Sequence, residues 1–222
     1  MYDALEHVVS YREMLDSVFA AAGPVRGRVV VDVGCGTGNL LAQFACDEPA
    51  RLIGIDASDA MLERARIKLR VHLDEGRIEL RECDAVAGLA AMPPDSVDVV
   101  VASNVLYALP DRSVFWRAAC RVLRSDGRIV ISNPDRPGFG PAIRQQWRTR
   151  RVRGFADGRL PEVVLLNLAI DLLSATHRYE FVPWARLAAE ADRAGLTRAD
   201  FLGRCYGGPN DGMNVVGILA PS

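Results

Sequence analysis

The sequence lacks the patterns that build metal centres, disulfide frameworks and membrane spans. Its five cysteines form no C-x-x-C pair and no cysteine–histidine spacing typical of zinc sites. Such a scattered, odd set of thiols indicates a reducing compartment. No run approaches the roughly 18 apolar residues of a membrane span. The stretch MYDALEHVVSYREM carries acidic residues and no apolar segment of a secretory signal. These absences predict a cytoplasmic protein without a resident metal or a membrane partner.

The sequence also lacks an excess of charge of either sign. The chain has 27 Lys+Arg against 28 Asp+Glu, a formal net charge of -1, and Lys68 is its single lysine. A balanced charge exerts no general pull on nucleic acid or anionic lipid, so neither is expected as a partner. With 222 residues, half of them hydrophobic, the chain has the size and composition of one globular domain.

Short β-rich runs alternate with helical patterns between residues 28 and 133. Strands are expected at 28–34, 51–56, 77–83, 96–106 and 128–133, with helices between them, one of them opened by Ser58 as N-cap. This alternation predicts an α/β fold whose parallel strands are covered by helices on both faces. After a further helix at 183–196, the last segments are expected to close the sheet as a hairpin, giving seven strands.

We expect a single domain made of four parts. Residues 1–27 carry an N-terminal helix and 28–133 form the ligand-binding core. Residues 134–180 show no strand signal and are expected to form a helical insertion after the fifth strand. Residues 181–222 supply the last helix and the hairpin.

A glycine-rich turn follows the first expected strand. It reads Asp32-Val-Gly-Cys-Gly-Thr-Gly38 and is neither G-x-G-x-x-G, because Asn39 stands at the last glycine position, nor a P-loop. The second strand ends in Asp56 and the third is followed by Asp84. Because ligands of open α/β sheets bind beyond the carboxyl ends of the strands, these acids are expected around one pocket. Without a basic partner in the turn, they favour a cationic ligand.

Five segments resemble, in order and at the same spacing, the motifs of class I S-adenosylmethionine-dependent methyltransferases. They are DVGCGTGNL, IGIDASDAMLERAR, CDA, SNVLYAL and RVLRSDGRIVIS, and the resemblance runs from about Tyr11 to Asn133. It implies a Rossmann-like fold, S-adenosyl-L-methionine as cofactor and in-line methyl transfer to a small organic acceptor.

The resemblance also implies where the cofactor is held. Asp32 and the glycine turn would contact its methionine part, Asp56 the ribose, and Asp84 the adenine amine, with Met61 under the adenine ring. The full implied set is Tyr11, Asp32, Gly34, Cys35, Gly36, Gly38, Asp56, Ala57, Met61, Asp84, Ala85, Asn104 and Val105. Asp56 and Asp84 each have an alternative role as a helix cap, and Tyr11 has one as ordinary packing on its helix.

The acceptor side is less defined by sequence. We expect the insertion 134–180 to fold over the cleft as a lid that selects the acceptor, with Tyr107, Arg144 and Trp147 in the acceptor pocket. His177 and Tyr107 are the candidates for a general base, which only a weakly acidic acceptor needs. For each of them a surface or core role is the alternative. Asn133-Pro134-Asp135 lacks the second proline and the aromatic of the amino-methylating motif and is not assigned to catalysis.

Three alternatives stay open at this point. An RNA or protein methyltransferase would use the arginines between 144 and 153 as a docking surface. A nicotinamide-dependent oxidoreductase would share the fold, although the glycine spacing argues against it. A non-catalytic binding protein would have had no reason to keep the cofactor motifs. The acceptor, the methylated atom and a homodimeric state are not determined by the sequence.

Overall fold

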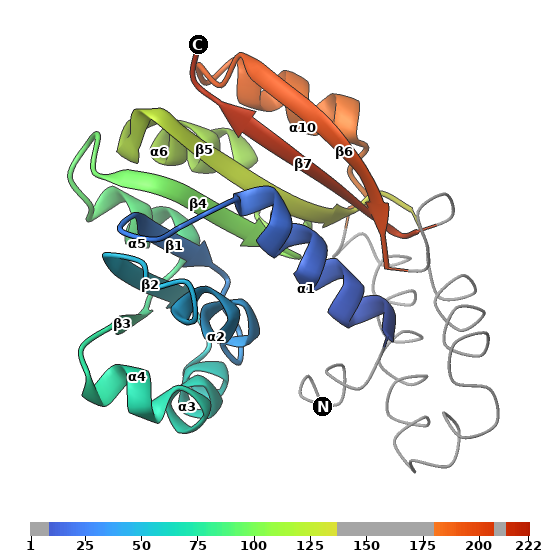
Figure 1. Cartoon of the computed structure of the whole chain (residues 1–222). Helices are drawn as coiled ribbons and strands as arrows, with labels where there is room; N and C mark the ends of the chain where they lie inside the picture. The colour runs from blue at the N-terminus through green and yellow to red at the C-terminus, as the bar shows by residue number, and fades with distance from the viewer. Residues whose placement is uncertain (1–8, 137–179, 207–211) are drawn as a thin grey trace, which may run out of the picture.

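A seven-stranded sheet forms the centre of the molecule (Figure 1). The computed structural model describes residues 9–136, 180–206 and 212–222. The strand order is β3-β2-β1-β4-β5-β7-β6, in which β1 to β5 are parallel and β7 runs antiparallel to both neighbours. The strands are β1 (Val29–Val33), β2 (Arg51–Asp56), β3 (Ile78–Glu82), β4 (Val97–Ser103), β5 (Leu123–Pro134), β6 (Arg198–Cys205) and β7 (Asn214–Ala220). The predicted Rossmann-like, mostly parallel sheet is confirmed.

Helices cover both faces of this sheet. The described helices are α1 (Val9–Ala22), α2 (Asn39–Ala45), α3 (Asp59–Lys68), α4 (Arg70–Asp74), α5 (Ala85–Ala90), α6 (Arg112–Val122) and α10 (Trp184–Asp192), with a 3-10 turn η2 (Leu106–Ala108). Buried side chains of α1, α2 and α3 pack on one face, and those of α5, α6 and α10 on the other. The layers therefore follow the α/β pattern expected from the sequence.

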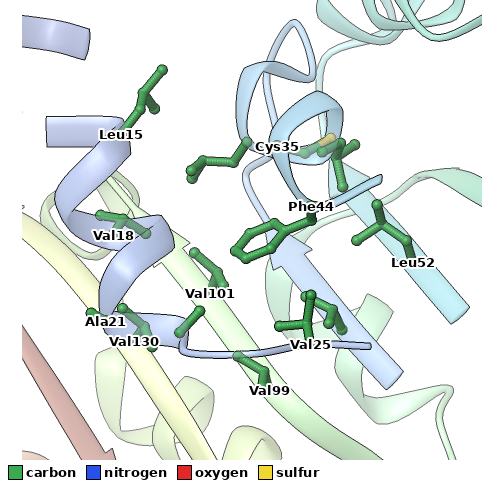
Figure 2. Close-up of a cluster of buried hydrophobic side chains, with 14 of the residues drawn as sticks. Leu15, Val18, Ala21, Val25, Cys35, Phe44, Leu52, Val99, Val101 and Val130 are labelled. Atoms are coloured by element: carbon green, nitrogen blue, oxygen red, sulfur yellow. The ribbon is translucent and has the colours of Figure 1, made fainter. Parts of the chain in front are cut away.

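Alternating strand residues build the two cores. Val99 and Val101 point to the α1–α2 face, where they lie in one cluster with Phe44 (Figure 2). The ring centroids of Phe44 and Phe19 are 5.3 Å apart, with the rings tilted. Val100 belongs to the cluster on the α6 face. Because parallel strands are buried on both faces, their sequences contain continuous apolar runs, such as residues 99–102 of β4.

The helix expected between the third and fourth strands is the short α5. Two local features differ from the sequence expectation. The helical run after Ser58 breaks at Leu69, whose side chain packs against Gly38 in the glycine turn. Strand β5 begins at Leu123, five residues before the expected start, and pairs with Val97 across an irregularity in the ladder.

The expected insertion lies outside the described residues, apart from its two ends, so the four-part division of the chain stays a prediction. In the described ranges, no helix is both long and apolar enough to cross a membrane.

Candidate functional site

The glycine turn after β1 has a left-handed backbone. Gly34, Gly36 and Gly38 have φ angles of +68°, +55° and +80°, a conformation that L side chains rarely adopt. A Cβ on Gly34 would lie 2.2 Å from Cγ2 of Val105, whereas one on Gly36 would meet nothing within 4 Å. The turn is therefore packed tightly against the loop after β4 and leaves open space at Gly36.

Asp56 at the end of β2 braces this turn. Its Oδ2 accepts the Gly36 N–H at 2.8 Å and its Oδ1 accepts the Ser58 N–H at 2.9 Å. Ser58 occupies the N-cap position of α3, as expected, but its side chain makes no capping hydrogen bond. The expected position of the N-cap is thus correct, but the Ser58 hydroxyl does not accept the hydrogen bond that a capping serine usually accepts.

Asp32 is the most deeply buried acid of the site, with 2% of its surface exposed. Burial, reinforced by the charge of Asp56, raises the pKa of Asp32 to about 8. Burial and then the neighbouring acids also raise the pKa of the Cys35 thiol, which argues against a thiolate nucleophile there. The site is therefore short of positive charge, and a cationic ligand would relieve that shortage.

Asp84 follows β3 and caps α5. Its Oδ1 accepts the N–H groups of Val86 and Ala87, each at 2.9 Å. The helix-cap alternative considered for Asp84 is therefore realised, and Asp84 also lines the pocket described next. Its second carboxylate oxygen has no part in the cap.

A pocket of about 550 Å³ lies where the carboxyl ends of the strands meet. Most residues predicted for the cofactor line it, together with Tyr107. They are Tyr11, Asp32, Gly34, Cys35, Gly36, Asp56, Ala57, Met61, Asp84, Ala85, Asn104 and Val105. Gly38 is not among the lining residues and instead forms the N-cap of α2. Arg144, Trp147 and His177 lie outside the described residues.

Sequence reasoning missed another set of residues that line this pocket. Met14 and Leu15 of α1, Phe181, and Tyr206 with Met213 at the β6–β7 turn also line it. One signal could have found the last two. In a hairpin that closes the sheet antiparallel to β5, the β6–β7 turn must lie at the carboxyl edge of the parallel strands.

Lys68 supplies positive charge beside the glycine turn. Its Nζ donates to Oδ1 of Asn39 and approaches Oγ1 of Thr37 at 3.4 Å. Asn39 in turn donates through Nδ2 to the hydroxyl of Tyr11 at 3.3 Å. These bonds connect α1 to α3 across the start of α2, a connection not expected from the sequence.

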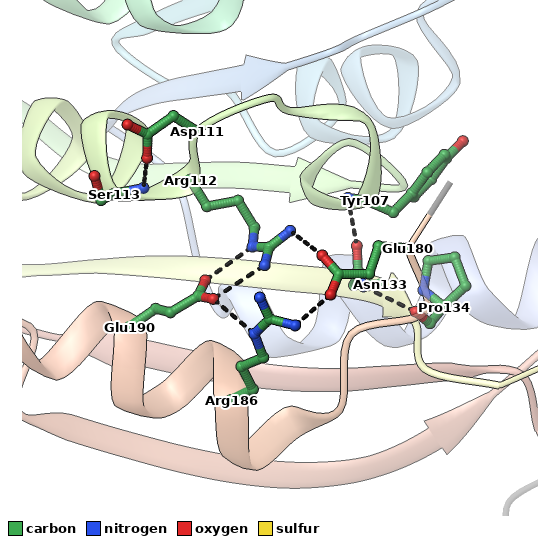
Figure 3. Close-up of polar contacts among 9 residues, drawn as sticks. All are labelled: Tyr107, Asp111, Arg112, Ser113, Asn133, Pro134, Glu180, Arg186 and Glu190. Atoms are coloured by element: carbon green, nitrogen blue, oxygen red, sulfur yellow. Dashed lines mark hydrogen bonds and ion pairs between the residues drawn. The ribbon is translucent and has the colours of Figure 1, made fainter. Parts of the chain in front are cut away.

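An ion-pair cluster stands at the other end of the pocket (Figure 3). Arg112 of α6 donates to both oxygens of Glu190, at 2.8 and 3.0 Å, and to Glu180 at 3.2 Å, while Arg186 also bridges Glu180 and Glu190. Glu180 lines the pocket, so this cluster fixes a pocket residue to α6 and α10.

The arrangement can hold a ligand with a positively charged part near Asp32 and a hydroxylated part near Asp56. In the ranges that the structure describes, no three His, Cys, Asp or Glu side chains form a group able to hold a metal ion. The described walls offer packing, hydrogen bonds and negative charge.

Comparison with known proteins gives a consistent result. The family model described as "Methyltransferase domain" matches residues 24–161. The ubiquinone biosynthesis O-methyltransferase of Thiobacillus denitrificans is 30% identical over 185 residues, which cover 82% of this chain and 70% of the relative. That of Idiomarina loihiensis is 34% identical over 110 residues, 50% of this chain and 44% of the relative. The chain thus spans less than half the length of that relative.

Solved structures share the fold at low identity. The magnesium protoporphyrin IX methyltransferase of Synechocystis, solved with S-adenosylhomocysteine, has a TM-score of 0.63 at 19% identity and covers 98% of this chain and 86% of its own. The [4+2]-cyclase SpnF has a TM-score of 0.60 at 19% identity, over 86% of this chain and 58% of its own.

Proposed function

The chain belongs to the methyltransferase domain family, the class I S-adenosylmethionine-dependent enzymes, and from that premise we propose that it methylates a small, mostly apolar organic acceptor. The observation that carries the acceptor proposal is the composition of the pocket walls. Among the described lining residues there is no Lys, Arg or His, and large apolar or aromatic side chains line much of the pocket: Tyr11, Met14, Tyr107, Tyr206 and Met213.

The residues at the strand ends fit S-adenosylmethionine. Three of the carboxylates that line the pocket, those of Asp32, Asp56 and Asp84, lie at the strand ends, and Gly36 leaves open space where any larger residue would project a side chain. The raised pKa of Asp32 indicates a buried acid that a cationic ligand would stabilise in its charged form. In this proposal Asp56 holds the ribose, Asp84 the adenine amine, and Asp32 the positively charged methionine end.

When bound, the cofactor supplies a methyl group activated by its sulfonium. The chain has to align the acceptor with that methyl group and exclude water. Asn104 and Val105 would form the wall beside the reacting centre. Tyr206 and Met213 would cover the acceptor from the hairpin side, while α1 would close the pocket through Tyr11 and Met14.

The relatives favour oxygen as the acceptor atom. The better matched ones are O-methyltransferases of ubiquinone biosynthesis, although a C-methyltransferase of Cronobacter sakazakii is 29% identical over 145 residues. An aromatic hydroxyl would suit the apolar wall. A base would then be needed, and Tyr107, which lines the pocket, and His177 stay candidates for it. Arg144 and Trp147 stay predicted acceptor contacts.

The test is to incubate the protein with methyl-labelled S-adenosylmethionine and a cell extract separated into small molecules, RNA and protein. Label in the apolar small-molecule fraction is expected. A second assay compares catechol with 3,4-dihydroxybenzoate, which adds one carboxylate to the same ring, and catechol is expected to be the better acceptor. Label only in RNA or protein would overturn the proposal and make the arginines between 144 and 153 the candidate docking surface.

A further inference from the structure

The loop after β4 is held in a strained conformation at the pocket. Asn104 has a φ angle of +56°, in the left-handed region that few non-glycine residues occupy. Asn104, Val105 and Tyr107 all line the pocket. A strained backbone of this kind persists only where its surroundings fix it. The contacts that fix this loop therefore bear on the geometry of the site.

Three buried polar residues of β5 and β7 hold the loop through hydrogen bonds. The backbone oxygen of Ser132 accepts the Asn104 N–H at 2.8 Å. Oδ1 of Asn133 accepts the Tyr107 N–H at 3.1 Å (Figure 3). Nδ2 of Asn214, the first residue of β7, donates to Oδ1 of Asn104 at 2.6 Å. Ser132, Asn133 and Asn214 have no exposed surface.

Asn214 uses only one side of its amide. Its Nδ2 reaches Oγ of Ser132 at 2.9 Å as well as Asn104, whereas its Oδ1 has no hydrogen-bond partner in the part of the chain that the structure describes. A buried carbonyl left without a partner destabilises the fold. The next two residues of β7 are valines, and an apolar side chain at position 214 would leave no such carbonyl unpaired. The donor function of the amide is therefore what this position uses.

The loop also carries the contact with the glycine turn. Val105 lies so close to Gly34 that a Cβ there would be 2.2 Å from its Cγ2. A shift at Asn104 would move Val105 and with it the wall that faces Gly34. The hydrogen bond from Asn214 thus reaches the cofactor half of the pocket through two neighbouring residues.

We infer that Asn214 is a positioning residue, whose amide fixes the side chain and strained backbone of Asn104 and so keeps the Asn104–Tyr107 loop in its ligand-binding position. This inference rests on the proposed function and extends it to a residue of β7 that does not line the pocket. Asn214 acts through Asn104, without touching the ligand.

The variant Asn214→Asp tests this directly. A protonated carboxyl can donate to Asn104 as the amide does, whereas a carboxylate has no proton to donate and would face the partial negative charge of the Asn104 amide oxygen. Burial raises the pKa of such a group. By titration calorimetry with S-adenosylhomocysteine, the variant is expected to bind within about twofold of the unmodified protein at about pH 5.5 and roughly tenfold more weakly at about pH 8.5.

The control variant is Ser132→Ala, which removes the hydroxyl that accepts from the same amide and keeps both the Asn214–Asn104 bond and the backbone oxygen of residue 132 that accepts the Asn104 N–H. It is expected to bind S-adenosylhomocysteine like the unmodified protein at both pH values. Equal losses in the two variants at both pH values, or no loss in Asn214→Asp, would overturn the inference and leave Asn214 a structural residue.

A second variant covers the case in which Asn214→Asp does not fold. Asn104→Gly relaxes the left-handed backbone and removes the accepting oxygen, so it is expected to fold and to bind S-adenosylhomocysteine about tenfold more weakly. Unchanged affinity in Asn104→Gly would overturn the inference. Failure of the unmodified protein to bind S-adenosylhomocysteine would instead count against the proposed function.

Discussion

Oδ2 of Asp56 accepts a hydrogen bond from the Gly36 N–H at 2.8 Å, which ties the end of β2 to the glycine turn after β1. The same side chain that would hold the ribose thus shapes the turn beside it. Ligand binding and turn geometry are therefore coupled through one carboxylate.

Replacing Asp56 should affect both. In Asp56→Ala, the affinity for S-adenosylhomocysteine is expected to fall about 100-fold, because two charge-assisted hydrogen bonds to the ribose and the brace on Gly36 are lost together. Titration calorimetry measures the loss. The matched control is Asp59→Ala, since Asp59 is exposed and, among the residues that the structure describes, pairs with Arg66. Equal affinities in the two variants would contradict the role of Asp56.

Asp32 should make the ligand-free protein less stable as pH rises. Its pKa is about 8 when folded and ordinarily 3.8, so between these values the unfolded chain releases a proton that the folded chain retains. Stability falls over that interval. Asp32→Asn is therefore expected to melt at a higher temperature than the unmodified protein at pH 8, with no difference below about pH 4. A variant that is less stable at pH 8 would show that the acid is already charged in the fold.

The same acid should give cofactor binding a pH dependence. The methionine ammonium and the sulfonium both favour the carboxylate form of Asp32, so affinity for S-adenosylmethionine is expected to rise with pH and to level off above about 8. S-adenosylhomocysteine keeps the ammonium but lacks the sulfonium charge and should show a shallower rise. In Asp32→Asn the ratio of the two affinities is expected to be independent of pH. An unchanged slope in that variant would assign the effect to another group.

Gly34 should tolerate no side chain. In Gly34→Ala the new methyl group would overlap Val105 and the φ of +68° would be strained, so a loss of about 3 kcal/mol or more is expected. Gly27→Ala is the matched control, because its φ is +71° and a Cβ there meets nothing within 4 Å. It should lose about 1–2 kcal/mol from backbone strain alone. Denaturant unfolding measures both, and similar losses would show that the loop gives way at Val105.

The ion-pair cluster around Arg112 should matter more than an exposed pair. The Arg112 side chain is 9% exposed, and removing it in Arg112→Met leaves Glu190 without its bidentate partner. A loss of about 2 kcal/mol is expected. The exposed pair Arg26–Glu48 is the control, and Arg26→Met should leave the unfolding free energy unchanged. An unchanged unfolding free energy in Arg112→Met would mean that Arg186 holds both glutamates alone.

The strands of the sheet and the acids at the strand ends could be predicted because apolar runs and the residues that end them are local signals. The order of the strands in the sheet was not predicted. The break at Leu69 could not be predicted either, because it depends on where that side chain packs against Gly38. Lys68 gave no local signal for its contact with Asn39. Tyr206, Met213 and Asn214 were missed for a similar reason, since the place of the first two at the pocket and of Asn214 beside Asn104 depends on how the hairpin pairs with β5.

Met14 on α1 and Asn214 on β7, which are 200 positions apart in the chain, lie in contact beneath the loop after β4. A ribosome makes the cofactor half of the site long before it makes β7. During synthesis the nascent chain can therefore complete β1 to β4 while Asn104 still lacks its partner, and long-range pairings of this kind form late. The chain is thus expected to bind its ligand only after β7 has paired with β5, so formation of the β6–β7 hairpin is the folding step that completes the site.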